Sequence, residues 1–216
     1  MALISDEDKD YLRKEFEEKL SGEVKLVMFT QEHECRFCME TREIVETLAG
    51  LSNKIEAKVY HFVYDKEKAD EYGVDKIPAI LVIGEKDYGI RFYGIPSGYE
   101  FTTLIQDIIE VSKGETSLGE ELKKKIADID ETMHIQVFVT PTCPYCPSAV
   151  HLAHQAAIEN DNIRADMVEI AEFPHLAHKY NVMSVPKTVI NESFEFVGAL
   201  PEEAFIEKIS LAKQQK

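Results

Sequence analysis

Segments in which apolar residues recur with the period of a helix alternate along the chain with short apolar segments typical of strands. Near the N-terminus, Leu12, Phe16 and Leu20 recur every fourth residue, which predicts an amphipathic helix. The short apolar run VKLVMF then predicts a buried strand, and the β-branched and aromatic segment IEAKVYHFVY predicts a second strand. Helical and strand patterns therefore succeed one another from the start of the chain.

The same order of elements is predicted twice, as helix, strand, helix, strand, helix, strand, strand and helix. The first half continues with a helix after Cys35, a short helix in KEKADEYG, the strands AILVI and IRFYG, and a helix from about Pro96 to Lys113. The second half consists of SLGEELKKKIADI, IQVFV, CPYCPSAVHLAHQAAI, IRADMVEI, EFPHLAHKY, KTVI, FEFVG and PEEAFIEKISLAK. Alternating strands and helices imply parallel pairing through crossovers, and the last two strands of each half predict an antiparallel hairpin.

The chain also contains an internal repeat of two cysteines and a proline. The matching positions are Cys35, Cys38 and Pro78 in the first copy, and Cys143, Cys146 and Pro186 in the second. Self-similarity of this kind predicts a duplicated unit. Gly, Ser and Thr gather in SKGETSLG, so we expect two domains, residues 1–115 and 116–216. The predicted fold class is α/β, with a central mixed β-sheet flanked by helices in each domain.

Composition and charge narrow the class of protein. Hydrophobic residues make up 44% of the chain and charged residues 30%, which is typical of a globular protein. The formal net charge of −16 offers no basic surface for a phosphate backbone, so neither nucleic acid nor a membrane is an expected partner. The N-terminus MALISDEDKD lacks the pattern of a secretory signal. Many Glu and Lys residues without Trp are compatible with a thermophile.

All four cysteines belong to the two CxxC pairs, so none is left for a scattered framework of disulfides. This usage favours a cytoplasmic location and thiols that are either catalytic or metal-binding. A zinc site is the first alternative, but zinc modules usually place their CxxC pairs about 15 to 20 residues apart. Inert cysteines in the core are the second alternative. The duplicated context favours redox chemistry, and no metal is expected.

The position of each CxxC pair suggests different tasks for its two thiols. Cys35 and Cys143 each follow a strand and precede a helix, where unpaired amides and the helix dipole stabilise a thiolate. We expect these two to be exposed and to attack a substrate disulfide. Cys38 and Cys146 lie one turn further on, where we expect them to be sheltered and to resolve the mixed disulfide.

Three further residues of the second active-site helix lead to expectations. If Cys143 caps this helix, Pro147 cannot donate the first intrahelical hydrogen bond and should distort the helix start. His151 and His154 lie three positions apart, as metal ligands on a helix can. We expect them to be helix surface residues instead.

The duplicated CxxC pairs, the sequence CPYC, and the dipeptides Ile77-Pro78 and Val185-Pro186 at matching positions resemble the thioredoxin/glutaredoxin superfamily. They are most similar to the glutaredoxin-like protein disulfide oxidoreductases of thermophiles. The resemblance covers essentially the whole chain and implies two tandem thioredoxin-like domains, with a CRFC site in the first and a CPYC site in the second. It further implies that all four cysteines are redox-active and that both prolines follow cis peptide bonds.

The implied activity is dithiol–disulfide exchange, which reduces, forms or isomerises disulfides in cytoplasmic proteins. In the resembling family, the CPYC site is usually the stronger reductase. The predicted substrate-binding residues are Ile77, Pro78, Val185, Pro186, Phe37 and Tyr145. The chain has no dinucleotide fingerprint and no expected cofactor, so its electrons would come from a thioredoxin-reductase-like flavoprotein. A dedicated electron carrier to a peroxidase and a chaperone-like peptide-binding module are the alternative functions.

The strands before the two sites lack one feature of thioredoxins. Neither VKLVMF nor IQVFV carries the buried acid that thioredoxins have in this strand. The sequence therefore identifies no proton acceptor for Cys38 or Cys146.

Overall fold

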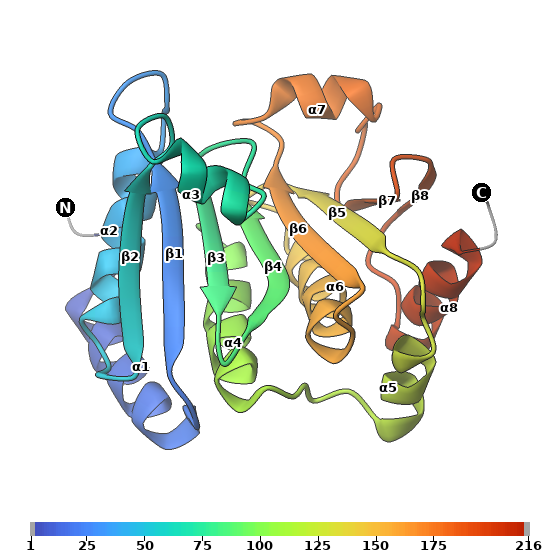
Figure 1. Cartoon of the computed structure of the whole chain (residues 1–216), viewed down its shortest axis with the longest axis horizontal. Coiled ribbons are helices and arrows are strands. Elements are labelled where there is room, and N and C mark those ends of the chain that lie inside the picture. Colours follow the sequence, from blue (N-terminus) through green and yellow to red (C-terminus); the bar gives the residue numbers. More distant parts are fainter. Residues whose placement is uncertain (1–2, 214–216) are drawn as a thin grey trace.

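The computed structural model describes residues 3–213, and these contain eight helices and eight strands (Figure 1). The first half contains α1 (Asp6–Lys19), β1 (Val24–Thr30), α2 (Cys38–Ala49), β2 (Ile55–His61), α3 (Lys66–Glu71), β3 (Ala79–Ile83), β4 (Asp87–Tyr93) and α4 (Glu100–Lys113). The second half contains α5 (Glu120–Ala127), β5 (Met133–Val139), α6 (Cys146–Glu159), β6 (Ile163–Glu169), α7 (Pro174–Lys179), β7 (Lys187–Ile190), β8 (Phe194–Val197) and α8 (Glu202–Ala212). The predicted order of elements is confirmed in both halves.

The strands form one continuous sheet in the order β2-β1-β3-β4-β6-β5-β7-β8. The pairs β1–β2 and β5–β6 are parallel, and β3–β4 and β7–β8 are antiparallel hairpins, as predicted. The two halves join where β4 pairs in parallel with β6, from Ile90 opposite Ala165 to Tyr93 opposite Val168. This pairing covers an edge strand of each half and therefore holds the halves together through backbone hydrogen bonds.

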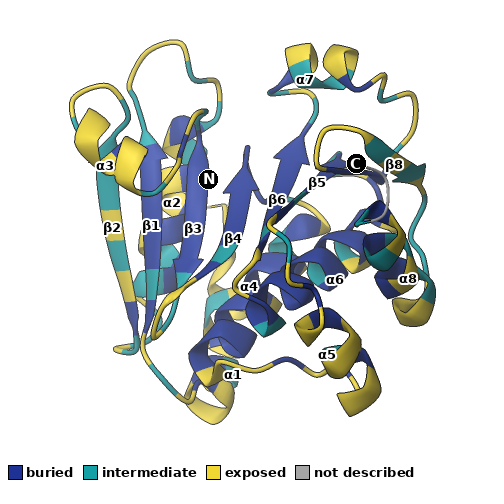
Figure 2. Cartoon of the chain, turned by 45° about the vertical axis from the view of Figure 1, so that its right-hand side comes forward, coloured by how far each residue is buried: buried dark blue, intermediate teal, exposed yellow. Residues whose placement is uncertain are grey.

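Helices cover both faces of the sheet. The apolar cluster on one face includes residues of α1, α2, α4, α5, α6 and α8, whereas the cluster on the other face includes residues next to or within α3 and α7. Leu26 and Met28 of β1 belong to the first cluster, and Val27 and Phe29 belong to the second. Successive side chains of a strand point to opposite faces, and all four are fully buried because both faces are covered. Figure 2 shows β1 as buried. No helix among residues 3–213 is long and apolar enough to cross a membrane.

Three helix starts differ from the predictions. The helix predicted from Pro96 begins at Glu100, after an irregular segment in which Gly94 and Gly98 have positive φ angles of 92° and 61°. The helices α2 and α6 begin at the second cysteine of each pair and not at the first. Tyr145 is the N-cap of α6, so Pro147 stands in the first turn, where helical amides have no intrahelical partner. The distortion expected from a Cys143 cap therefore does not apply.

The two histidines of α6 lie at the junction between the halves and not on the helix surface, so this prediction was wrong. Helix α6 packs against α4 of the first half. The His154 Nδ1 atom lies 2.5 Å from the Asp107 carboxyl, and both side chains are fully buried. The His151 Nδ1 atom lies 3.2 Å from the same carboxyl. The apolar pattern of α6 could not reveal this burial, because the covering helix belongs to the other half of the chain.

Candidate active site

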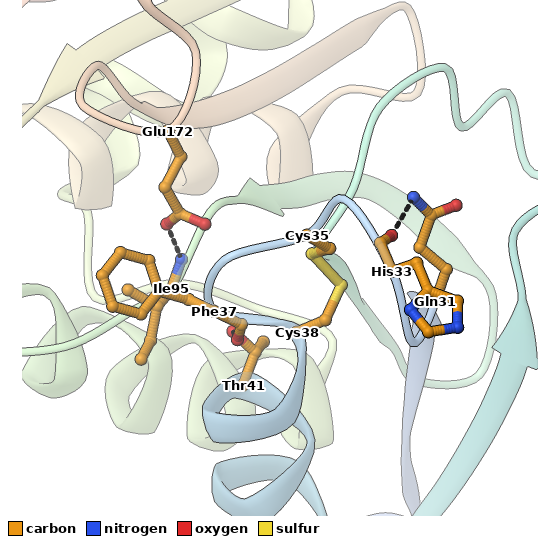
Figure 3. Close-up of a disulfide and its surroundings, with 8 residues drawn as sticks. All are labelled: Gln31, His33, Cys35, Phe37, Cys38, Thr41, Ile95 and Glu172. Carbon is orange, nitrogen blue, oxygen red and sulfur yellow. Dashed lines mark hydrogen bonds between the residues drawn. A yellow bond between two sulfur atoms is a disulfide. The ribbon is translucent and has the colours of Figure 1, made fainter.

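Two disulfides lie after the strands β1 and β5, where the chain turns into α2 and α6. Cys35 is bonded to Cys38, and Cys143 is bonded to Cys146, with Cα atoms 5.5 Å apart in each pair. Figure 3 shows the first pair at the start of α2. The structure therefore brings the four predicted cysteines together as two separate pairs, one in each half.

The two cysteines of each pair differ in exposure in the predicted direction. Cys38 is 1% exposed and Cys146 is 0% exposed, as expected of sheltered thiols. Cys35 is half-buried, and Cys143 is itself buried at 8% exposed, so the expectation that both first cysteines are exposed was wrong, although each is more exposed than its partner. In each pair, an incoming sulfur atom therefore meets the first cysteine more readily than the second. The buried position of the second cysteine is set by the first turn of the helix that it opens.

A proline after a cis peptide bond belongs to each half. The bonds Ile77-Pro78 and Val185-Pro186 are both cis, as the resemblance implied. The Cys143 Sγ atom lies 3.9 Å from the Val185 carbonyl oxygen, so this loop borders the second disulfide. The backbone amide and carbonyl groups of Ile77 and Val185 are the ones that could form hydrogen bonds with an extended peptide.

The two aromatic residues predicted to contact substrate are placed differently. Tyr145 is 70% exposed and is free to contact a bound protein. Phe37 is half-buried and packs against the core, with the Arg36 guanidinium 4.9 Å from its ring centroid. The two positions match in sequence, but only Tyr145 presents most of its ring to the surface.

A buried acid at the start of α4 was missed in the sequence. Glu100 opens α4 and is only 1% exposed. Its Oε2 atom accepts a hydrogen bond of 2.9 Å from Thr103, whereas its Oε1 atom has no partner among the described residues. Burial raises the pKa of Glu100 to about 7, and the nearby Asp107 charge acts in the same direction. A carboxyl with this pKa can both accept and return a proton near neutral pH.

The packing of α4 against α6 places Glu100 at the level of the second disulfide. The polar contacts along the two helices include Asp107 with His151 and His154, and Glu110 with Gln155; just beyond the end of α4, Thr116 donates to Glu159 of α6. The partners stay between 43 and 47 residues apart, so the helices run side by side in the same direction. Glu100 is therefore level with residues 143–147. Its side chain leans toward the N-terminal end of α4, because helical side chains point that way.

Comparisons with known proteins agree with this architecture. A family model described as "Thioredoxin domain" matches residues 133–210. The structure of a protein disulfide oxidoreductase from Aeropyrum pernix superposes with a TM-score of 0.91 at 30% identity, over 98% of this chain and 94% of that one. The chain belongs to the protein disulfide oxidoreductases. This family lies within the thioredoxin/glutaredoxin superfamily, and the fold is therefore two tandem thioredoxin folds with one CxxC pair each.

Two further relatives are a domain of a reductase and a protein named NADH dehydrogenase. The N-terminal domain of the alkyl hydroperoxide reductase AhpF from Enterococcus faecalis superposes with a TM-score of 0.86 at 28% identity, over 94% of this chain and 98% of that one. A protein named NADH dehydrogenase from Bacillus subtilis is 30% identical over 154 residues, which are 70% of this chain. The oxidoreductase spans only 28% of the length of that relative.

A second acid of the oxidoreductase borders the first disulfide from the other half of the chain. Glu172 lies between β6 and α7, and its Oε1 atom accepts a hydrogen bond of 2.6 Å from the Ile95 amide (Figure 3). Burial raises the pKa of Glu172 to about 7; the Ile95 hydrogen bond opposes this, and the charge of Glu169 adds to it. Sequence reasoning missed this residue too, because it lies far along the chain from the CRFC motif.

Proposed function

We propose that this protein disulfide oxidoreductase exchanges disulfides of other proteins through two nucleophile-and-resolver pairs, one in each domain. Cys35 and Cys143 attack, and Cys38 and Cys146 resolve. The observation that carries this assignment is the difference in exposure within each pair. The two domains are proposed as residues 1–115 and 116–216, which is supported by the sheet order, because β1–β4 and β5–β8 form separate blocks.

In the reducing direction, the chemistry proceeds in two steps. The Cys143 thiolate attacks one sulfur of the substrate disulfide, forms a mixed disulfide and releases the other substrate sulfur as a thiolate. The Cys146 thiol then loses its proton and attacks the Cys143 sulfur. A Cys143–Cys146 disulfide forms and the second substrate thiolate leaves, so two electrons pass from the dithiol to the substrate. Oxidation of a substrate dithiol runs through the same steps in reverse.

Glu100 is the proposed proton acceptor for Cys146. Its buried carboxyl has one oxygen atom without a hydrogen-bond partner among residues 3–213 and lies at the level of the second pair. The carboxylate accepts the Cys146 proton before the second attack, and the resulting acid can return it to the departing thiolate. The pKa of about 7 suits both transfers, because neither form is strongly favoured at neutral pH.

The substrate is proposed to bind in extended form beside the cis-prolines. Ile77 and Val185 would offer backbone groups to it, and Pro78 and Pro186 would hold these loops against the disulfides. Tyr145 and Phe37 would contact the flanking side chains. The position of Cys143 next to the Val185 carbonyl supports this arrangement at the second site.

A flavoprotein of the thioredoxin-reductase type is the proposed source of electrons. The support is the similarity to the N-terminal domain of AhpF and to a protein named NADH dehydrogenase, together with the lack of a dinucleotide fingerprint in this sequence. The proposed location is the cytoplasm, because all four cysteines belong to CxxC pairs and none to a structural framework.

Reduction of insulin by dithiothreitol tests the proposed function. We expect the wild-type chain to accelerate precipitation of the insulin B chain, and a variant with Ser at all four cysteine positions to give the uncatalysed rate. Retained activity in that variant would instead support the chaperone-like alternative, because that activity needs no thiols.

The similarity to AhpF favours the second alternative, a dedicated carrier to a peroxidase. A dedicated carrier would fail to accelerate insulin reduction even as the wild type, while still donating electrons to a peroxidase. The presence of two complete pairs argues for the broader activity, since one pair suffices for a carrier.

A further inference from the structure

The two disulfides of the oxidoreductase lie in surroundings of different charge. At the second site, neither residues 140–148 nor residues 183–186 include an acidic or basic side chain. Tyr145 and Met183 are instead exposed there, by 70% and 85%. The second site therefore presents an apolar, uncharged surface to a substrate.

The matching segments of the first site carry several charges. The acids are Glu32, Glu34, Glu40 and Asp75, and the bases are Arg36 and Lys76. The Lys76 ammonium is 2.5 Å from the Asp75 carboxyl and 3.7 Å from the Tyr93 ring centroid, so its charge is already engaged. The surface around the first disulfide is therefore acidic overall.

Glu172 adds a further acid to the first site from the second half of the chain. The Gly94 amide donates to the Pro78 carbonyl, so residues 94–95 adjoin the cis-proline loop. A Cβ atom on Gly94 would lie only 2.6 Å from the Glu169 Cβ and 2.7 Å from the Glu172 Oε1 atom. The segment with Glu169 and Glu172 thus lies directly against this border of the first site.

The corresponding border of the second site is open. The Gly198 amide donates to the Pro186 carbonyl in the same way, but within residues 3–213 no atom beyond its chain neighbours lies within 4 Å of a Cβ built on Gly198. The acidic segment with Glu169 and Glu172 therefore borders the first site from the opposite half of the chain, whereas no such segment lies at the matching position of the second site.

The charge of Glu172 interacts with the CRFC segment itself. Arg36 lowers the pKa of Glu172, whereas Glu40 raises it. An electrostatic interaction acts equally on both partners, so an ionised Glu172 also acts on charges brought to this site by a substrate. Opposite charges across an interface increase the rate of association, and like charges disfavour the wrong partner.

We propose that the first dithiol selects protein disulfides flanked by basic residues, with Glu172 of the second half as a specificity-determining residue, whereas the second dithiol selects disulfides with uncharged or apolar flanks. This inference rests on the proposed function, because it divides the substrates of the same two dithiols. Glu172 does not enter the exchange chemistry.

Two single-site variants test the proposal. The first-site variant carries Cys143→Ser and Cys146→Ser, and the second-site variant carries Cys35→Ser and Cys38→Ser. Each is given fluorogenic peptides that contain one disulfide flanked by Lys, Ala or Glu, at low ionic strength. We expect the first-site variant to prefer the Lys peptide over the Glu peptide by about tenfold in kcat/KM, a size typical of electrostatic steering. The second-site variant should prefer the Ala peptide.

The substitution Glu172→Gln isolates the role of this charge. Glutamine can still accept the hydrogen bond from the Ile95 amide, so the loop should keep its position. We expect it to lower the Lys-over-Glu preference of the first-site variant by about threefold, as the loss of one partly screened charge would. In the second-site variant, the same substitution should change nothing. Glu85→Gln, at the exposed turn between β3 and β4, is the matched control and should leave the preference intact.

A pH series adds a readout that a purely structural role would not produce. The charged groups that act on Glu172 are Glu169, Arg36 and Glu40, and its pKa is about 7. The Lys-over-Glu preference should therefore rise between pH 6 and pH 8 as Glu172 ionises, and Glu172→Gln should flatten this rise.

Equal rates with the Lys and Glu peptides at the first site, or an unchanged preference after Glu172→Gln, would overturn the inference and leave the proposed function standing. If the first-site variant reduces none of the peptides, both the inference and the proposed exchange function are wrong for the first dithiol.

Discussion

Replacing Cys143 by Ser is expected to remove most of the insulin-reducing activity of the chain, whereas Cys35→Ser should leave most of it. Loss of an attacking thiolate abolishes covalent exchange at its own site, an effect of at least about 100-fold there. The residual rate of Cys143→Ser is then that of the first site alone. We expect it to be below about a tenth of the wild-type rate, since the first site has an acidic border and only the second is open and apolar.

The measurement is the initial rate of insulin precipitation with dithiothreitol for the wild type and the two single variants. Thermal unfolding under reducing conditions provides the control, because a serine in place of a reduced cysteine should leave the melting temperature nearly unchanged. A larger loss with Cys35→Ser would reverse the ranking of the sites. Wild-type rates in both variants would contradict the exchange chemistry altogether.

The substitution Glu100→Gln is expected to slow the resolving step at the second site by about 10- to 100-fold at pH 7, within the range of general-base catalysis. Glutamine keeps the size of the side chain and its hydrogen bond from Thr103 but cannot accept a proton. The attack by Cys143 should continue, so a mixed disulfide with substrate should accumulate. Stopped-flow kinetics of the second-site variant, with and without Glu100→Gln, measure both steps.

The pKa of Glu100 determines in which direction the resolving rate should change with pH. The pKa of Glu100 is raised to about 7, so the carboxyl is mostly protonated at pH 6 and mostly ionised at pH 8. The resolving rate should therefore rise through pH 7 in the parent and lose this inflection in Glu100→Gln. Burial disfavours the ionised form, so the substitution should not destabilise the fold at neutral pH.

The first-site variant is the matched control for Glu100. Because Glu100 lies at the level of residues 143–147, its substitution should leave exchange by Cys35 and Cys38 unchanged. An unaltered resolving rate and pH profile at the second site would contradict the assignment of Glu100 as proton acceptor.

Much of the fold could be predicted because its causes are local in the sequence. The five residues of β3 and the four residues of β7 match the predicted strands residue for residue. AILVI is a short apolar run, KTVI is rich in β-branched residues, and each directly follows a proline. The CxxC pairs and the prolines could be found because the repeat preserves their spacing. These patterns identified the four cysteines and both cis-proline loops.

Several features that could not be predicted depend on contacts between the halves. The pairing of β4 with β6 joins an edge strand of one half to an edge strand of the other. The sequence of an edge strand does not show which other strand it will pair with. Glu100, Asp107 and Glu110 form a polar row along the buried face of α4, and this row is visible in the sequence at helical spacing. The residues that contact this row, His151 and His154, belong to α6. The sequence of α4 alone therefore does not show which helix packs against it.

The most direct test of the central claim is to trap the mixed disulfide. The variant with Cys146→Ser, in a chain that also carries Cys35→Ser and Cys38→Ser, is mixed with a disulfide-containing protein and examined by mass spectrometry without reductant. The account predicts a covalent complex joined through Cys143 and released by dithiothreitol. The absence of this complex, or its formation after Cys143→Ser in a chain that retains Cys146, would contradict Cys143 as the attacking thiol.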